Sequence, residues 1–131
     1  MRELAVATHA RNELIDITSE VEKAVLDQGV AEGLCHVFVP HTTAGVTINE
    51  NADPDVSRDV QTTLASLIPH TGDYRHAEGN SDSHVKSSLV NCSAIVPVAG
   101  GRLVLGTWQA IYFCEFDGPR RRRCLVTAIG K

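Results

Sequence analysis

The chain has 131 residues, of which 43% are hydrophobic and 21% charged, with a formal net charge of −4 at pH 7. This length suits one domain, and the composition is that of a folded globular protein rather than a disordered or fibrous one. We therefore expect a single domain over residues 1–131, and the acidic balance argues against a general nucleic-acid binder.

The first thirty residues carry acids and bases throughout, and no apolar run approaches the roughly 20 residues of a membrane helix. We expect no signal peptide, no membrane and a cytoplasmic location. The four cysteines (Cys35, Cys92, Cys114 and Cys124) have no paired spacing, and three lie in apolar, strand-like runs. They are interpreted as reduced thiols.

Two short alternating stretches open the chain. Leu4 to Thr8 and Leu14 to Ile17 are predicted to be strands. Ser19 and Glu22 then have the spacing of a capping box, which predicts a helix that ends before Gly29.

Two more strands are predicted, an apolar one over Gly33 to Val39 and an alternating one over Ala44 to Asn49. Asp53 followed by Pro54 is a strong helix start. The helical spacing of the next apolar residues predicts one buried stripe, made of Val56, Val60, Leu64 and Leu67.

Residues 70–83 are polar and lack a period, and such a stretch inside a compact domain is usually functional or mobile. A short helix near Ser83 and four strands between Ala94 and Ile129 complete the chain, with Trp108 expected in the core. The predicted class is α+β, a mostly antiparallel β-sandwich of seven to eight strands with two main helices and a short third helix.

Three stretches collect side chains that can bind metals, transfer protons or hold phosphate. The first is HTTAGVTINEN, residues 41–51. Its polar residues end two successive strands, and a tight connection would bring the two groups to neighbouring sheet edges: His41, Thr42, Thr43, Asn49, Glu50 and Asn51. The alternative is that these residues only cap turns and strand ends.

The second stretch is HAEGNSDSHVKSSL, residues 76–89. His76 lies in the polar loop and His84 in the first turn of the next helix, with Glu78 between them. Imidazoles near carboxylates suit a divalent metal such as zinc, and His41 would add a third nitrogen if its strand end faces this loop. The alternative is a set of hydrogen-bonded polar loop residues.

The third stretch combines GTWQ, residues 106–109, with GPRRRR, residues 118–123. Along a strand, Arg120 and Arg122 share one face, and the planar fork of arginine suits phosphate oxygens. Gln109 is a candidate ligand on the face opposite Trp108. The alternative for the arginine run is a solvated face or a subunit contact.

Together the three stretches resemble the signature blocks of the YjbQ-like family, also called secondary thiamine-phosphate synthase, and the resemblance covers essentially the whole chain. It implies an α+β sandwich that assembles as a homotrimer. It also implies a weak, secondary condensation of hydroxymethylpyrimidine pyrophosphate with a thiazole phosphate. The family's polar positions fall on His41, Thr42, Thr43, Asn49, Glu50, Asn51, His76, Glu78, Asn80, His84, Gly106, Thr107, Gln109, Arg120 and Arg122.

On this basis we expect a divalent metal, zinc or magnesium, on His41, His76 and His84, and catalysis by Glu50, Glu78 and His84. The residues expected to bind a small phosphorylated metabolite are Thr42, Thr43, Asn49, Asn51, Asn80, Thr107, Gln109, Arg120 and Arg122. Two alternatives stay open. One is a metal-assisted hydrolase of a small phosphorylated or cyclic metabolite, and the other is a non-catalytic trimeric module that binds an anion or a metal.

Overall fold

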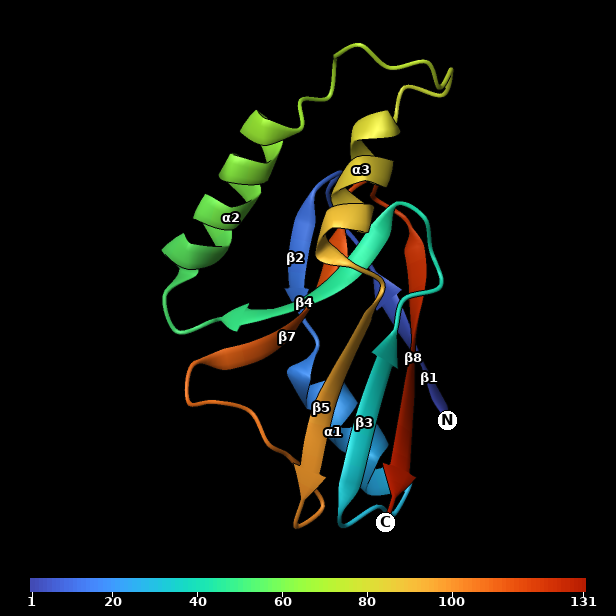
Figure 1. Ribbon diagram of the computed structural model, residues 1–131, viewed down its shortest axis with the longest axis vertical. Helices are drawn as coiled ribbons and strands as arrows, with labels where there is room; N and C mark the ends of the chain where they lie inside the picture. The colour runs from blue at the N-terminus through green and yellow to red at the C-terminus, as the bar shows by residue number, and fades with distance from the viewer.

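The computed structural model describes residues 1–131 as eight strands and three helices. One antiparallel sheet has the order β1-β8-β3-β5-β6 and the other β2-β7-β4 (Figure 1). The predicted α+β class is confirmed. The elements are β1 (Arg2–Ala7), β2 (Glu13–Asp16), α1 (Thr18–Asp27), β3 (Gly33–Phe38), β4 (Ala44–Glu50), α2 (Pro54–Leu67), α3 (Ser81–Val90), β5 (Ser93–Ala99), β6 (Arg102–Leu103), β7 (Gln109–Glu115) and β8 (Arg121–Gly130).

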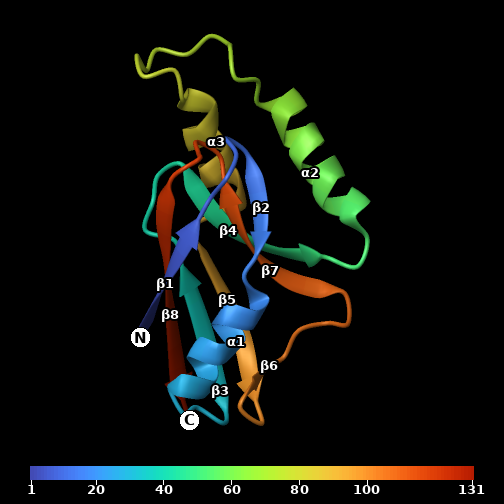
Figure 2. The ribbon, with the colours of Figure 1, turned by 180° about the vertical axis from the view of Figure 1, so that it is seen from behind.

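The hydrophobic core lies between the two sheets and α1. Because successive side chains of a strand point to opposite faces, the buried residues of β3 and β8 alternate with more exposed ones, as at Cys35 and Val126. Helix α1 crosses the back of the five-stranded sheet (Figure 2) and buries Val21, Ala24 and Val25. Burying a valine side chain contributes about 1.5–3 kcal/mol to the stability of the fold. The core therefore fixes the positions of the strand ends.

Helix α2 begins as the sequence predicts but does not bury its stripe. The Asp53 side chain accepts a hydrogen bond from the Asp55 amide at 2.9 Å, and Pro54 takes the first position. No residue of α2 is fully buried: Val56, Val60 and Leu64 are half-buried, and Leu67 is 70% exposed at the end of the helix, which lies at the outside of the molecule (Figures 1 and 2). The predicted burial is wrong because an apolar period indicates a helix, not how closely it packs.

Helix α3 packs against β4 with its polar face inward. It exposes Val85 and Leu89 and buries Asp82, Ser83, Lys86 and Ser87. At the point of closest approach, a Cβ on Gly45 would lie 2.6 Å from the Asn91 carbonyl oxygen. The absence of a side chain there lets the helix lie directly on the strand.

Two local predictions are wrong. Ile17, not Ser19, precedes α1 and makes no side-chain cap bond. Glu22 instead accepts from the Leu103 amide at 3.1 Å, so its carboxylate joins α1 to β6. Trp108, expected in the core, lies in the loop before β7 and is 61% exposed.

The cysteine prediction is confirmed, since all four thiols are free and only Cys92 is not fully buried. None of the three helices has the length and apolar character needed to cross a membrane.

Candidate functional site

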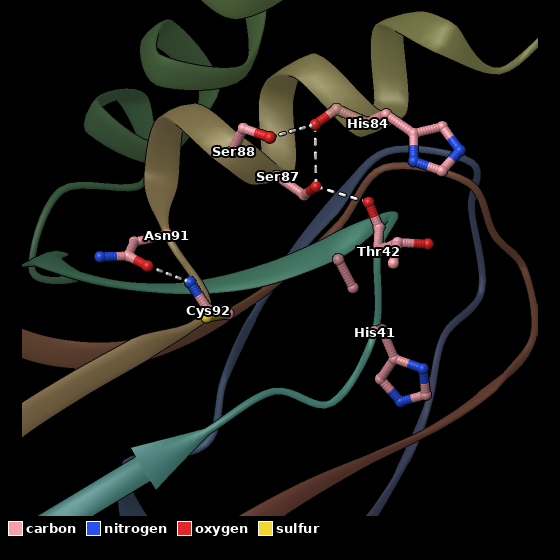
Figure 3. Close-up of a pocket in the computed structure, with 8 residues that line it drawn as sticks. His41, Thr42, His84, Ser87, Ser88, Asn91 and Cys92 are labelled. Carbon is pink, nitrogen blue, oxygen red and sulfur yellow. Dashed lines mark hydrogen bonds between the residues drawn. The ribbon is translucent and has the colours of Figure 1, made fainter. Parts of the chain in front are cut away.

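Three adjoining cavities surround residues 41–43, the segment between β3 and β4. One of about 320 Å³ lies between this segment and α3 (Figure 3). A second of about 460 Å³ lies at the start of α3, and a third of about 520 Å³ lies beside the end of β3. We name them together the polar trough, after the residues that line at least two of them: His41, Thr42, Thr43, His84, Cys92 and Arg120.

A buried ion pair holds the 41–43 segment. Arg122 on β8 donates from Nε to Glu115 Oε1 at 2.9 Å and from Nη2 to Thr43 Oγ1 at 2.8 Å. The two charged side chains are 3% and 0% exposed. Burial opposes ionisation of Glu115, but hydrogen bonds from Arg122, the Asp117 amide and Thr8 outweigh it and hold the pKa below its ordinary value. Arg122, predicted to bind phosphate, thus lies in the interior and positions Thr43.

Arg120 is the arginine at the edge of the trough. It precedes β8, its side chain is 49% exposed, and it lines the second and third cavities. Its Nε donates to the Asp117 carbonyl oxygen at 2.9 Å and its Nη2 to Asp117 Oδ2 at 3.1 Å. Asn80 donates to the same carboxylate at 2.8 Å, and its own Oδ1 is buried without a partner. These contacts fix the guanidinium while its Nη1 stays free for an anion.

His41 lines the first and third cavities and is attached to β8. Its Nε2 accepts a hydrogen bond from the Arg123 backbone amide at 3.0 Å. Burial and the charge of Arg122 lower the pKa of His41, and the carboxylate of Glu115 offsets only part of this effect. His41 therefore presents a neutral imidazole to the trough.

His84, in the first turn of α3, lines the first and second cavities. Its ring makes an edge contact with that of His76, with centroids 5.3 Å apart, and His76 Nε2 lies 3.8 Å from Glu78 Oε2. The rings of His41 and His84 project to the same side, with Thr42 between them (Figure 3). No protein group forms a hydrogen bond with the His84 ring, so its ring nitrogens are open to a ligand.

A second charge cluster, which no sequence pattern predicted, supports the start of α3. Arg11, between β1 and β2, binds the buried Asp82 carboxylate through both terminal nitrogens at 2.9 and 3.0 Å and also lines the second cavity. Lys86 lies 3.7 Å from the same carboxylate. The four-residue spacing of Asp82 and Lys86 on one helix face was a partial signal. Nothing near Arg11 marks it as their partner.

Five predicted site residues lie away from the trough: Asn49, Glu50, Asn51, Thr107 and Gln109. The 41–43 segment precedes β4, whereas Asn49 and Glu50 end it. A strand of 7 residues spans about 20 Å at roughly 3.3 Å per residue. Asn51 donates to Asp16 at 2.7 Å, and Gln109 accepts from the Gly106 amide at 2.8 Å. The expected tight connection between residues 41–43 and residues 49–51 is wrong, because the two sets lie at opposite ends of β4.

The three histidines predicted as metal ligands do not form one group. No three His, Cys, Asp or Glu side chains in the chain are arranged to hold a metal ion. The Arg123 amide occupies His41 Nε2, which leaves His76, His84 and the Glu78 carboxylate. Since a catalytic zinc site uses three well-placed protein ligands, these residues as arranged do not fit one, and metal binding at His76 and His84 stays a prediction.

Comparison with known proteins agrees with the fold. Residues 2–131 match the family model described as UPF0047 protein YjbQ-like. The chain is 51% identical to UPF0047 protein YugU of Bacillus subtilis, covering 99% of each chain. It is also 51% identical to a UPF0047 protein of Methanocaldococcus jannaschii, covering 95% of this chain and 91% of the relative. A crystal structure of a YjbQ/UPF0047 family protein from Clostridium acetobutylicum has a TM-score of 0.97 at 52% identity, covering 98% of this chain and 100% of that one. The chain belongs to the YjbQ-like (UPF0047) family.

Proposed function

We propose that the protein condenses hydroxymethylpyrimidine pyrophosphate with thiazole phosphate to thiamine phosphate, as a weak secondary activity of a site for small phosphorylated metabolites. One observation carries this proposal. The trough combines an arginine with a free nitrogen, an imidazole without a protein partner and the Thr42 hydroxyl group. A cavity of about 460 Å³ is within the usual range for small-molecule sites.

In this reaction the thiazole nitrogen attacks the methylene carbon of the pyrimidine. The C–N bond forms while the C–O bond to pyrophosphate breaks, and pyrophosphate leaves with the bonding electron pair. Such a step needs positive charge on the leaving group and a fixed approach for the nucleophile. Arg120 supplies that charge, and Thr42 orients the phosphate oxygens.

His84 is the proposed acid. It lines the second cavity together with Arg120 and donates a proton to a pyrophosphate oxygen as the C–O bond breaks, which reduces the charge that develops on the leaving group. The side chain of Glu78 is 74% exposed at the rim and lies 3.8 Å from the ring of His76, which contacts the ring of His84. Its proposed role in proton transfer is therefore indirect. Glu50 lies at the far end of β4 and has no role in the trough of the same chain.

The proposed assembly is a homotrimer. The outer face of the five-stranded sheet supports association, because large apolar side chains of three neighbouring strands are exposed there: Leu34, Ile95 and Ile129. Light scattering should give three times the chain mass of 14.1 kDa. A mass equal to one chain at micromolar concentration would rule the trimer out.

The direct test is to incubate the purified protein with both substrates and to measure thiamine phosphate and pyrophosphate. Replacing Arg120 by Ala should raise KM for the pyrophosphate substrate roughly 10- to 100-fold, the effect of losing a charged hydrogen bond. Replacing His84 by Ala should lower kcat by about 10²–10⁴-fold. Arg121→Ala and His9→Ala are matched controls, since both side chains are exposed and outside the trough.

Product formation no faster than in buffer alone would end the condensation proposal. Phosphate or pyrophosphate release without the thiazole substrate would favour the hydrolase, and a rate abolished by chelators would show that this activity needs a metal. Stabilisation by pyrophosphate without turnover would favour the non-catalytic module.

A further inference from the structure

We propose that His41 is locked in one neutral tautomer, and that its Nδ1–H donates a hydrogen bond to an anionic phosphate oxygen bound in the polar trough. The role is that of a positioning donor, not of an acid, a base or a metal ligand. It rests on the proposed function only for the identity of the phosphate compound.

The tautomer follows from the contact with β8. The Arg123 backbone amide lies 3.0 Å from His41 Nε2. A backbone N–H can only donate, so Nε2 must present its lone pair. A neutral imidazole has one proton, which therefore resides on Nδ1. No acceptor within the chain binds this Nδ1, and the ring lines the first and third cavities.

The sheet explains why this amide is available. Strands β3 and β8 pair as far as Phe38 opposite Leu125. Two residues further along the same register, Pro40 would face Arg123. Proline ends the ladder because it has no N–H and its ring restricts the chain. The His41 ring then takes the place of the missing strand partner and is held by a strand that belongs to the core sheet.

The charged surroundings favour the neutral form. Protonation would place a hydrogen on Nε2 directly against the Arg123 amide hydrogen. The titratable and charged groups that act on the ring are the guanidinium groups of Arg122 and Arg123 and the carboxylate of Glu115. Burial and the two cations act against a charged imidazolium, and the carboxylate of Glu115 acts for it without reversing the lowering of the His41 pKa.

The ligand chemistry follows from the donor. A fixed N–H needs an acceptor, and Arg120 lines the third cavity beside His41, so an oxygen with negative charge satisfies both groups. A metal ion at Nδ1 would have to displace the proton and leave an imidazolate, because Nε2 already accepts a hydrogen bond. Metal coordination by His41 is therefore excluded as long as the Arg123 contact persists.

The first measurement is the tautomer itself, in wild-type protein labelled with ¹⁵N-histidine. Two-bond proton–nitrogen correlations should show His41 protonated on Nδ1 alone at about pH 7 and above, because its pKa is lowered from the ordinary value of about 6.5. A proton on Nε2, or an imidazolium at pH 7, would overturn the proposal. This readout needs no substrate and no variant, so it stands apart from the condensation assay.

The second measurement is the binding of inorganic pyrophosphate by calorimetry. His41→Gln keeps an acceptor for the Arg123 amide and a donor for the ligand, whereas His41→Leu keeps neither. Leucine should weaken binding roughly tenfold, the value of one hydrogen bond, and glutamine should restore most of it. His9→Leu is the control. Equal affinity of wild type and His41→Leu would show that Nδ1–H binds no phosphate, while intact pyrophosphate binding without condensation would overturn only the proposed reaction.

Discussion

Replacing Arg122 by Met should destabilise the fold, because it leaves the Glu115 carboxylate buried without its cation. Removing one partner of a buried ion pair costs about 3–5 kcal/mol. Glu115 would keep three donors, the Thr8 hydroxyl at 2.8 Å and the amides of Phe116 and Asp117 at 3.0 Å. These donors put the expected loss at the lower end, about 3 kcal/mol.

The assay is urea unfolding followed by circular dichroism. Arg121→Met is the matched control, because Arg121 is the preceding residue of β8 and is exposed, and its effect should stay within about 0.5 kcal/mol. The double variant Arg122→Met with Glu115→Gln should recover part of the loss, since no unpaired charge remains buried. Equal unfolding free energies for Arg122→Met and Arg121→Met would refute the assignment of Arg122 to the interior.

Two further predictions concern ionisable groups. Burial opposes ionisation of Asp82 and Glu115, but hydrogen bonds from Arg11 and Arg122 hold the pKa of each below the ordinary values of 3.8 and 4.5. A lowered folded-state pKa contributes stability above the ordinary pKa, so urea unfolding at a series of pH values should show stability lost as pH falls below about 4. Unchanged stability down to about pH 3 would contradict this. Among the thiols, only Cys92 should react quickly with a thiol reagent in the native protein, because burial raises the pKa of Cys35 to about 11 and of Cys114 and Cys124 to about 12. Rapid native modification of more than one thiol per chain would be incompatible with the described core.

Local signals predicted elements better than they predicted packing. The start of α2 follows from Asp53 and Pro54 alone, because a cap and a fixed φ act within one turn. The exposure of Trp108 and the partial burial of α2 depend on distant partners, which no window of the sequence contains. The predicted capping role of Glu22 was wrong for the same reason, since its actual partner, the Leu103 amide, lies 81 positions away in the chain.

The site was predicted in part. The sequence named His41, Thr42, Thr43, His84 and Arg120, and the structure brings them around one trough. Strand pairing decides which polar strand ends meet, and β4 pairs with β7 rather than turning back on β3. Asn49 and Gln109 therefore share the opposite end of the three-stranded sheet. No sequence motif surrounds Arg11, and only its contact with Asp82 in the folded chain identifies it as part of the site.

The run of arginines at the start of β8 has a consequence for mutation. Deleting any one of residues 120–123 produces the same shortened sequence, so composition cannot tell which arginine has been lost. Position on the sheet decides which arginine faces Glu115 and which amide holds His41. After a deletion, Arg120 can move from the loop into the strand, so that an arginine still occupies each of the two positions. Such a deletion would put Pro119 in the place of Arg120, so it would remove the loop cation and the amide that donates to Thr8 Oγ1 at 2.9 Å. The repeated arginines therefore keep a cation opposite Glu115 after such a deletion, whereas the guanidinium at the edge of the trough is lost.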